Sequence, residues 1–161
     1  MTKPFYIIGF MGTGKSSLKQ YLAKSNRVID LDELFETHTG MDIPAYFDRY
    51  GEAAFRLQES RLLQNARADY IVTGGGIVER EANMEWMREQ GVIITLDLPF
   101  EACWERIKDS DRPLVRNGKA AVHALYERRR PLYARANHVL DASLCTEAIA
   151  HTLNQLKEVE G

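Results

Sequence analysis

Gly9-Phe10-Met11-Gly12-Thr13-Gly14-Lys15-Ser16 is the stretch that decides the fold, and it has the spacing G-x-x-x-x-G-K-S. The apolar strand formers at 5–8 precede it, and residues 17–24 carry apolar side chains at helical spacing. A strand, a glycine-rich loop and a helix in that order are the context that a phosphate-binding P-loop requires. The backbone N–H groups of such a loop and the positive end of its helix form an anion site. The stretch therefore predicts a nucleoside triphosphate site with magnesium.

The side chains of this loop suit that chemistry. Lys15 is expected to reach the outer phosphates, and the Ser16 hydroxyl is suited to ligating Mg2+. The alternative is a glycine-rich turn that matches the motif by chance, which the flanking strand and helix disfavour. The remaining residues of the expected nucleotide-binding loop are Gly12, Thr13, Gly14 and Ser17.

Length and composition indicate one ordinary domain. With 161 residues, of which 45% are hydrophobic, we expect residues 1–161 to form a single domain. A formal net charge of −2 provides no basic field for nucleic acid or for an anionic membrane. Two cysteines are too few for a disulfide framework or a metal cluster. We find no signal peptide and no apolar run long enough to cross a bilayer, so we expect a cytoplasmic protein.

Strand-like and helical segments alternate along the chain, with strands expected at 5–8, 28–30, 70–73, 92–97 and 138–141. This order predicts a three-layer α/β/α P-loop kinase fold with a five-stranded parallel sheet. We expect a substrate-binding subdomain at about 32–67 and a mobile lid at 109–118, where the chain is polar and interrupted by Pro and Gly. Pro131 is expected to kink the helix of residues 119–136 or to divide it in two.

Two aspartates follow the second strand, in a position to take part in phosphate chemistry. Asp30 and Asp32 flank one residue and would share a face on an extended segment. Together they could hold Mg2+ through water and bind a substrate hydroxyl. Helix capping by Asp32 is the alternative, but it would explain only one of the two carboxylates.

Arginines and glycines suggest a second ligand. Arg56 and Glu59 lie three residues apart, either as a surface ion pair or with Glu59 orienting Arg56 toward an anion. Gly74-Gly75-Gly76 ends the third strand, which favours a pocket wall over a plain tight turn. Arg112, in the expected lid, could close onto the transferring phosphoryl group, although solvated loop arginines are common. Of the three arginines at 128–130, at most two can face a pocket, and a basic patch for nucleic acid is the alternative.

In chain order these motifs resemble those of the shikimate kinases, which phosphorylate the 3-hydroxyl of shikimate in aromatic amino-acid biosynthesis. The similarity covers nearly the whole chain, and six ordered motifs are far more specific than a P-loop alone. The motifs are the P-loop at 9–16, Asp30-Leu31-Asp32, Phe47 with Gly51-Glu52 and Phe55-Arg56-x-x-Glu59, Gly74-Gly75-Gly76, Arg112-Pro113-Leu114 and Arg129-x-Pro131-Leu132-Tyr133.

The resemblance implies a role for each motif. ATP would be the co-substrate, bound by the P-loop and by Arg112, and Mg2+ would be held by Ser16 and, through water, by Asp30. The catalytic residues would be Lys15, Asp32 and Arg112, with Asp32 as base or as positioner of the attacking oxygen. Arg106 is a candidate contact for the adenine.

The resemblance also implies the substrate site. Arg56 and Arg129 would bind the shikimate carboxylate, and Phe47 and Phe55 would line the apolar side of the ring. Contacts to the ring hydroxyls would come from Asp32 and from Gly74, Gly75 and Gly76. No motif requires a partner chain, so we expect a monomer that binds shikimate and ATP and neither nucleic acid nor membrane.

Two positions depart from the family pattern: Ser17 stands where many members have Thr, and Val72 where relatives often carry a small residue. With Val72 there, Mg2+ binding would depend more on Ser16 and Asp30. Three alternative functions remain: another small-molecule kinase such as a gluconate or nucleoside monophosphate kinase, a non-catalytic nucleotide-binding regulator, and a nucleic-acid binder. The presence of Lys15, Asp32 and Arg112 disfavours the regulator.

Overall fold

Strand β1 (Phe5–Ile8) is fully buried and forms the middle of a parallel sheet. The computed structural model describes residues 3–160, and its sheet has the order β2-β3-β1-β4-β5. Every neighbouring pair is parallel, as expected from helical crossovers. The other strands are β2 (Val28–Asp30), β3 (Tyr70–Val72), β4 (Val92–Asp97) and β5 (His138–Asp141).

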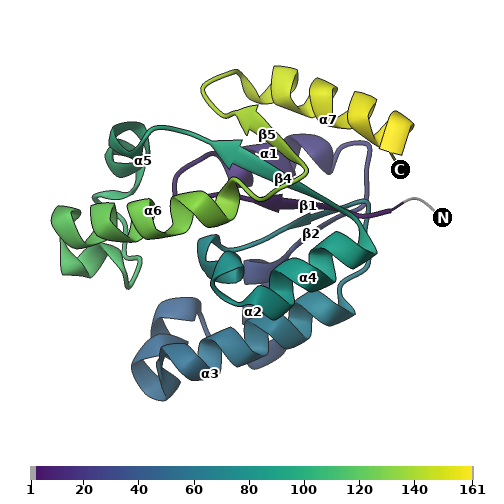
Figure 1. Ribbon diagram of the computed structural model, residues 1–161. Coiled ribbons are helices and arrows are strands. Elements are labelled where there is room, and N and C mark those ends of the chain that lie inside the picture. Colours follow the sequence, from purple (N-terminus) through teal and green to yellow (C-terminus); the bar gives the residue numbers. More distant parts are fainter. Residues whose placement is uncertain (1–2, 161) are drawn as a thin grey trace.

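Helices cover both faces of this sheet (Figure 1). Helices α1 (Lys15–Leu22) and α7 (Thr146–Glu160) pack together on one face. Helices α4 (Glu81–Gln90) and α6 (Lys119–Tyr133) lie on the other, and α5 (Phe100–Ile107) packs beside α6. Because β1 lies between β3 and β4, the loop that follows β1 lies at the middle of the carboxyl edge of the sheet. Ligands of open α/β sheets bind at this edge.

The expected substrate-binding segment forms a helical pair at one end of the molecule, made of α2 (Leu31–Thr39) and α3 (Ile43–Asn65). Aromatic rings join the two helices: the Phe35 centroid lies 4.8 Å from that of Tyr46 and 4.9 Å from that of Phe55. Gly51 interrupts α3 with a φ of 87°, which a residue with a side chain rarely adopts. The break expected at Gly51 is therefore present, and it separates two helical halves.

Two segments differ from the sequence-based expectation. A 3-10 helix, η1 (Gly75–Glu79), begins within the glycine triplet, so the helix expected from about residue 79 begins at Glu81. Pro131 does not divide its helix, since α6 is one helix from Lys119 to Tyr133. Proline lacks one N–H donor, and here only the last turn of the helix is affected, because α6 ends two residues later.

The segment 109–118 connects α5 to α6 and contains one turn of 3-10 helix, η2 (Val115–Asn117). Arg116 of this turn lies 3.5 Å from the Asp48 carboxylate of α3, through its Nη1. Both side chains are more than half exposed, so this ion pair is a weak contact between the segment and the helical pair. Among the described helices, none is both long and apolar enough to cross a membrane.

Candidate active site

The P-loop between β1 and α1 lines a cavity of about 440 Å³ at the carboxyl edge of the sheet. Gly12 allows its sharp turn, because its φ is 82° and a Cβ there would lie 2.9 Å from the Cys103 carbonyl oxygen. Thr13 is buried, and its hydroxyl donates a 3.0 Å hydrogen bond to the Phe10 carbonyl. All six residues expected to form the nucleotide-binding loop line this cavity, namely Gly12, Thr13, Gly14, Lys15, Ser16 and Ser17.

The Lys15 side chain is hydrogen-bonded to the backbone of its own loop. Its Nζ donates to the Gly9 carbonyl at 2.6 Å and to the Phe10 carbonyl at 2.9 Å. Burial lowers the pKa of Lys15 to about 8, although the nearby Asp32 carboxylate opposes the shift. The ammonium is therefore poorly solvated and close to neutralisation, and an anionic ligand in the cavity would stabilise its charge.

Asp30, not Asp32, is the helix cap. Its Oδ1 accepts from the backbone N–H of Asp32 at 2.9 Å and of Glu33 at 3.3 Å, while Oδ2 lies 3.4 Å from Lys19 Nζ. Asp32 already belongs to the first turn of α2, so the expectation that both aspartates share a face of an extended segment is wrong. Both carboxylates nevertheless line the P-loop cavity.

Asp32 lies where two cavities meet. It lines the P-loop cavity and a second cavity of about 330 Å³ between α2, α3, the glycine triplet and the segment 109–118. Burial raises the pKa of Asp32, and the neighbouring Asp30 raises it further, while Lys15 and Arg112 oppose both. A Cβ on Gly74 would lie 3.2 Å from Asp32 Oδ1, so a glycine there leaves room for this carboxylate. A proton acceptor thus lies at the junction.

The second cavity contains every residue expected to bind the second ligand: Asp32, Phe47, Phe55, Arg56, Gly74, Gly75, Gly76 and Arg129. It also contains residues that the sequence analysis did not single out. Glu36 is one of them, four residues after Asp32, and this helical spacing on α2 is the signal that could have identified it. Ile43 and Pro44 line the cavity as well, and they are apolar residues outside the recognised motifs.

Arg56 and Glu59 form an ion pair inside this cavity rather than on the surface. Arg56 Nη1 lies 3.1 Å from Glu59 Oε1, and the Glu59 side chain is 3% exposed. Burial raises the pKa of Glu59 to about 7, against the opposing charge of Arg56. Among residues 3–160, Glu59 Oε2 has no hydrogen-bond partner. A Cβ on Gly76 would lie 2.3 Å from the Arg56 guanidinium carbon, so glycine at this position lets Arg56 lie against the backbone.

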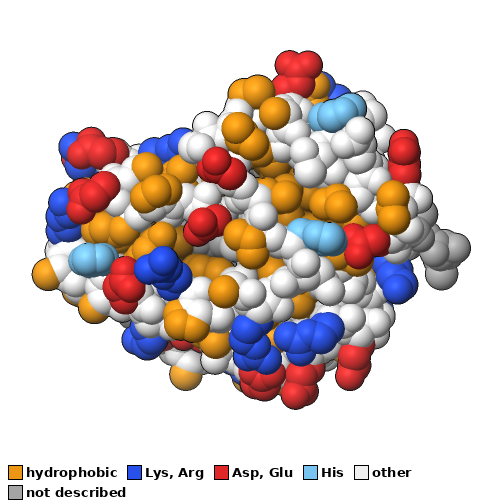
Figure 2. Space-filling view, turned by 45° about the horizontal axis from the view of Figure 1, so that its top comes forward, with side chains coloured by type: hydrophobic (Ala, Val, Ile, Leu, Met, Phe, Trp, Pro, Cys, Tyr) orange, Lys and Arg blue, Asp and Glu red, His pale blue; other side chains and the backbone are white. Residues whose placement is uncertain are grey.

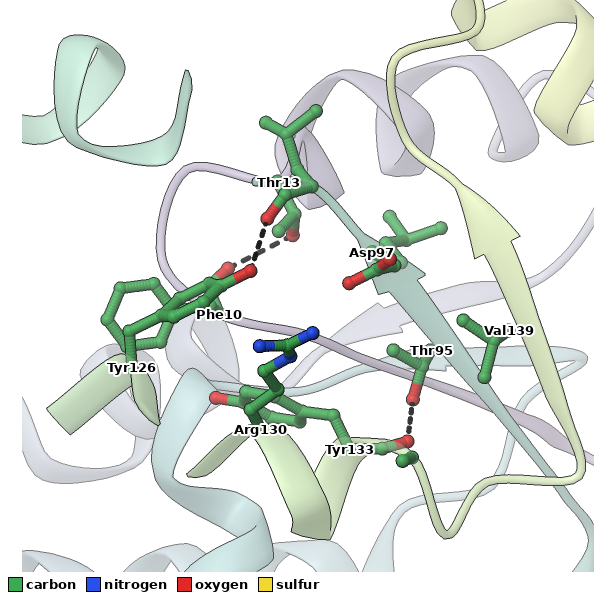
Figure 3. Close-up of a pocket in the computed structure, with 11 residues that line it drawn as sticks. Phe10, Thr13, Thr95, Asp97, Tyr126, Arg130, Tyr133 and Val139 are labelled. Atoms are coloured by element: carbon green, nitrogen blue, oxygen red, sulfur yellow. Dashed lines mark hydrogen bonds between the residues drawn. The ribbon is translucent and has the colours of Figure 1, made fainter. Parts of the chain in front are cut away.

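The three consecutive arginines of α6 point to three different places. Arg129 is 1% exposed and lines the second cavity, whereas the Arg128 side chain is 65% exposed. Arg130 lines a separate cavity of about 160 Å³ behind the P-loop, shown in Figure 3. The buried hydroxyls there are already bonded: that of Thr95, for example, donates to the Tyr133 carbonyl at 2.6 Å (Figure 3). Of the three arginines, Arg129 is therefore the one that lines the second cavity.

Arg112 lines both cavities, like Asp32, and comes from the segment 109–118. Arg106 lines the P-loop cavity, and its Nη1 donates to the Gly12 carbonyl at 2.9 Å. Val72 lies at the carboxyl end of β3 and lines the same cavity. Cationic side chains therefore line the P-loop cavity, and Arg112 lies at its border with the second cavity.

The donor set for a metal ion consists of hard oxygen atoms. No cluster of three or more His, Cys, Asp or Glu side chains suited to a metal exists within the described part of the chain. Mg2+ does not need one, because it is usually bound by one or two protein oxygens together with phosphates and water. The Ser16 hydroxyl and the Asp30 carboxylate line the P-loop cavity and fit this ion.

Known proteins share this architecture over almost the full chain. A family model described as shikimate kinase matches residues 11–157. Shikimate kinase of Thermodesulfovibrio yellowstonii is 36% identical over 167 residues, covering 98% of this chain and 95% of the relative. Shikimate kinase of Bacillus anthracis is also 36% identical, and the match covers 97% of each chain.

Solved structures confirm the expected fold. Shikimate kinase from Acinetobacter baumannii, solved in complex with shikimate, has a TM-score of 0.88 and 30% identity, and the match covers 97% of this chain and 93% of that chain. A sugar kinase from Janibacter, with 16% identity and a TM-score of 0.62, shares the fold alone. Family model, relatives and structures agree, and the chain belongs to the shikimate kinase family.

Proposed function

We propose that this protein transfers the γ-phosphoryl group of ATP to the 3-hydroxyl of shikimate, which yields ADP and shikimate 3-phosphate. The observation that carries the proposal is the position of Asp32, which lines both the P-loop cavity and the arginine-containing cavity. A hydroxyl bound in the second cavity would meet a phosphate bound in the first beside this carboxylate. The reaction belongs to aromatic amino-acid biosynthesis in the family that the chain matches.

The P-loop would hold ATP. Backbone N–H groups of the loop, including those of Gly12, Thr13 and Gly14, would bind phosphate oxygens, and Ser17 would contribute at the start of α1. Lys15 would exchange its two carbonyl acceptors for phosphate oxygens, which relieves the unfavourable burial of its charge. Arg112 would add a second cation from the segment 109–118, which serves as the lid.

The chemistry that a bound Mg2+ would supply is positive charge beside the phosphates during transfer. The Ser16 hydroxyl would be the direct protein ligand of the ion. Asp30 would act through water, with the oxygen that is not engaged in capping α2. Val72 contributes no polar atom from its side chain, which leaves Ser16 and Asp30 as the protein side chains for the metal.

Shikimate would lie in the second cavity, within a subdomain formed by residues 32–67. Its carboxylate would bind Arg56 and Arg129, because guanidinium groups pair with carboxylates through two parallel hydrogen bonds. Its ring would pack against Phe47 and Phe55, whose own ring centroids lie 4.9 Å apart. The glycine triplet at 74–76 would contact the ring hydroxyls, since glycines let a ligand approach the backbone closely.

Asp32 would accept a hydrogen bond from the attacking 3-hydroxyl and take its proton as the new O–P bond forms. Burial and the neighbouring Asp30 raise the pKa of Asp32, which makes this carboxylate a better proton acceptor than an exposed aspartate. Lys15 and Arg112 oppose the shift. The remaining catalysis would come from positioning and from charge neutralisation by the same two cations.

All of these groups come from one chain, so we propose that the monomer is the active unit. The charge distribution favours a small anionic substrate over a nucleic acid. On the face shown in Figure 2, Lys and Arg side chains lie interspersed with Asp and Glu. The arginines that line the two cavities would bind the anionic substrate locally. A net charge of −2 for the whole chain agrees with this local recognition.

A coupled assay of ADP release tests the proposal. ATP and Mg2+ are supplied with shikimate, with gluconate or with AMP, and release should depend on shikimate alone. Lys15→Ala should abolish this release, while circular dichroism and thermal unfolding report an intact fold. If gluconate or AMP supports release, the chain is a different small-molecule kinase. If ATP binds but no acceptor promotes release, the protein is a nucleotide-binding regulator and the proposal fails.

A further inference from the structure

We propose that Glu79 is a positioning residue for substrate binding: it holds Arg129 so that the free edge of the guanidinium faces the carboxylate of the substrate. This inference rests on the proposed function and deepens it. Glu79 is the last residue of the 3-10 helix η1, which begins within the glycine triplet, and Arg129 lies in α6. The two side chains meet at the wall of the substrate cavity.

The contact fixes one edge of the guanidinium. Arg129 Nε donates to Glu79 Oε2 at 3.1 Å, and Glu79 is the acidic partner of the Arg129 side chain in this ion pair. The Nη1 and Nη2 groups are not engaged by Glu79, and the Tyr133 hydroxyl is the other polar side-chain neighbour of the guanidinium. Nη1 and Nη2 form the planar fork that binds a carboxylate through two hydrogen bonds.

Glu79 is itself held in place. Arg128 Nη2 donates to the same Oε2 atom at 2.5 Å, from the preceding position on α6. Burial of Glu79 raises its pKa, but the hydrogen bonds from Arg128 and Arg129 outweigh burial and lower it. The carboxylate is thus ionised and bound from two sides, whereas a single contact would leave it free to rotate.

The surroundings of Arg129 make this support necessary. Its side chain is 1% exposed, and a buried cation without a counter-charge is strongly disfavoured. On the other side, a Cβ on Gly75 would lie 3.4 Å from Arg129 Nη1 and 3.5 Å from the Tyr133 hydroxyl. The guanidinium therefore lies between the Glu79 carboxylate and the backbone of Gly75, and its position depends on both.

A second ion pair between the same two regions provides a matched control. Glu81, at the start of α4, binds Arg135 through two hydrogen bonds of 2.7 Å, and Arg135 follows the end of α6. Neither residue lines the substrate cavity. Loss of this pair removes a link between the same segments without touching the group that binds the substrate.

The experiment compares Glu79→Ala, Glu79→Gln and Glu81→Ala with the wild type, by steady-state kinetics and by calorimetric titration of shikimate. Glu79→Ala should raise the KM and Kd for shikimate by about tenfold, as is typical when a ligand-binding group loses its supporting partner. The KM for ATP should stay within about twofold, because the P-loop lies in the other cavity. Glu79→Gln keeps an acceptor oxygen and should recover part of the affinity, and Glu81→Ala should bind shikimate as the wild type does.

The carboxamide of shikimate separates positioning from a structural role. The wild type should bind shikimate more tightly than the carboxamide. Glu79→Ala should lose much of that preference, because a displaced Arg129 guanidinium no longer forms its two hydrogen bonds with the carboxylate. An unchanged shikimate Kd in Glu79→Ala, or equal rises in both KM values, would overturn the inference while the proposed function stands. If the wild type neither binds nor turns over shikimate, the proposed function itself fails, and the role of Glu79 fails with it.

Discussion

Lys15 shows how burial sets the charge of a single side chain. Its pKa falls to about 8 mainly because burial removes the ammonium from water, and the Asp32 carboxylate restores only part of the loss. An ammonium with a lowered pKa loses its proton at a lower pH than a lysine in water. The free enzyme therefore loses the charge that attracts phosphate within an accessible pH range.

We expect kcat/KM for ATP to fall above pH 8, by about tenfold per pH unit once Lys15 is mostly neutral. The kcat at saturating ATP should hold to higher pH, because bound phosphates raise the pKa of Lys15 again. Burial raises the pKa of the nearby Cys103 thiol to about 11, so this group does not titrate in the same range. Rate profiles from pH 6 to about 10 measure the effect.

Lys15→Arg is the matched variant, since arginine keeps its charge throughout this range. Whatever its residual activity, its kcat/KM for ATP should lack the fall near pH 8. The same alkaline fall in the variant would assign the titration to another group.

Gly76→Ala tests the contact between the glycine triplet and Arg56. Gly76 does not have a positive φ, so alanine fits the backbone, but its Cβ would lie 2.3 Å from the Arg56 guanidinium carbon. The flexible end of Arg56 should move away while the fold survives. We expect the KM for shikimate to rise by about tenfold or more with little change in the KM for ATP, because one of two carboxylate-binding groups is displaced. Unchanged shikimate kinetics would show that Arg56 does not bind the carboxylate.

At the scale of the element, α2 depends on Asp30 for its first turn, and the proposed metal site depends on the same carboxylate. Oδ1 caps the helix, and Oδ2 faces Lys19. Asparagine caps a helix about as well as aspartate but carries no charge. The two roles can therefore be separated by substitution.

Asp30→Asn should keep its free energy of unfolding within about 0.5 kcal/mol of the wild type, whereas Asp30→Ala should lose about 1 kcal/mol. Both variants should need more Mg2+ for half-maximal activity, since each lacks the carboxylate. Urea unfolding and Mg2+ titrations of the rate measure the two effects. A wild-type Mg2+ requirement in Asp30→Asn would remove Asp30 from the metal site.

The elements themselves were largely predictable from the sequence. All five strands and the break at Gly51 lie where apolar runs and glycine indicated, because these signals are local. The 3-10 helix that begins within the glycine triplet was missed, since glycines carry no periodicity. Of the two outcomes expected at Pro131, a kink or a division, the division is wrong, because proline near a helix end disturbs only the last turn.

The site was predictable where a motif marked it and not where tertiary contacts created it. The P-loop, Arg56 and Arg129 were recognised from spacing and resemblance, and they line the two cavities. Asp30 rather than Asp32 caps α2, and a capping residue cannot be identified until the first residue of the helix is known. Glu79 carries no motif, and its contact with Arg129 spans 50 positions of the chain.

At the scale of the whole molecule, the two cavities meet under the segment 109–118, from which Arg112 reaches both. We expect this lid to close when both substrates are present. Amide hydrogen exchange within 109–118 should slow by about tenfold or more with a non-hydrolysable ATP analogue and shikimate together, and less with either alone. Equal exchange in all four conditions would contradict a closing lid.

The buried Glu59 Oε2, which has no hydrogen-bond partner among residues 3–160, has a consequence for the lifetime of the protein in a cell. An unpaired buried carboxylate oxygen is unfavourable. Ligands that fill the cavity shift the folding equilibrium toward the native state, by mass action alone. Chains without substrate open more often and are degraded sooner, so the abundance of the enzyme would follow the supply of its substrate, even at a constant rate of synthesis.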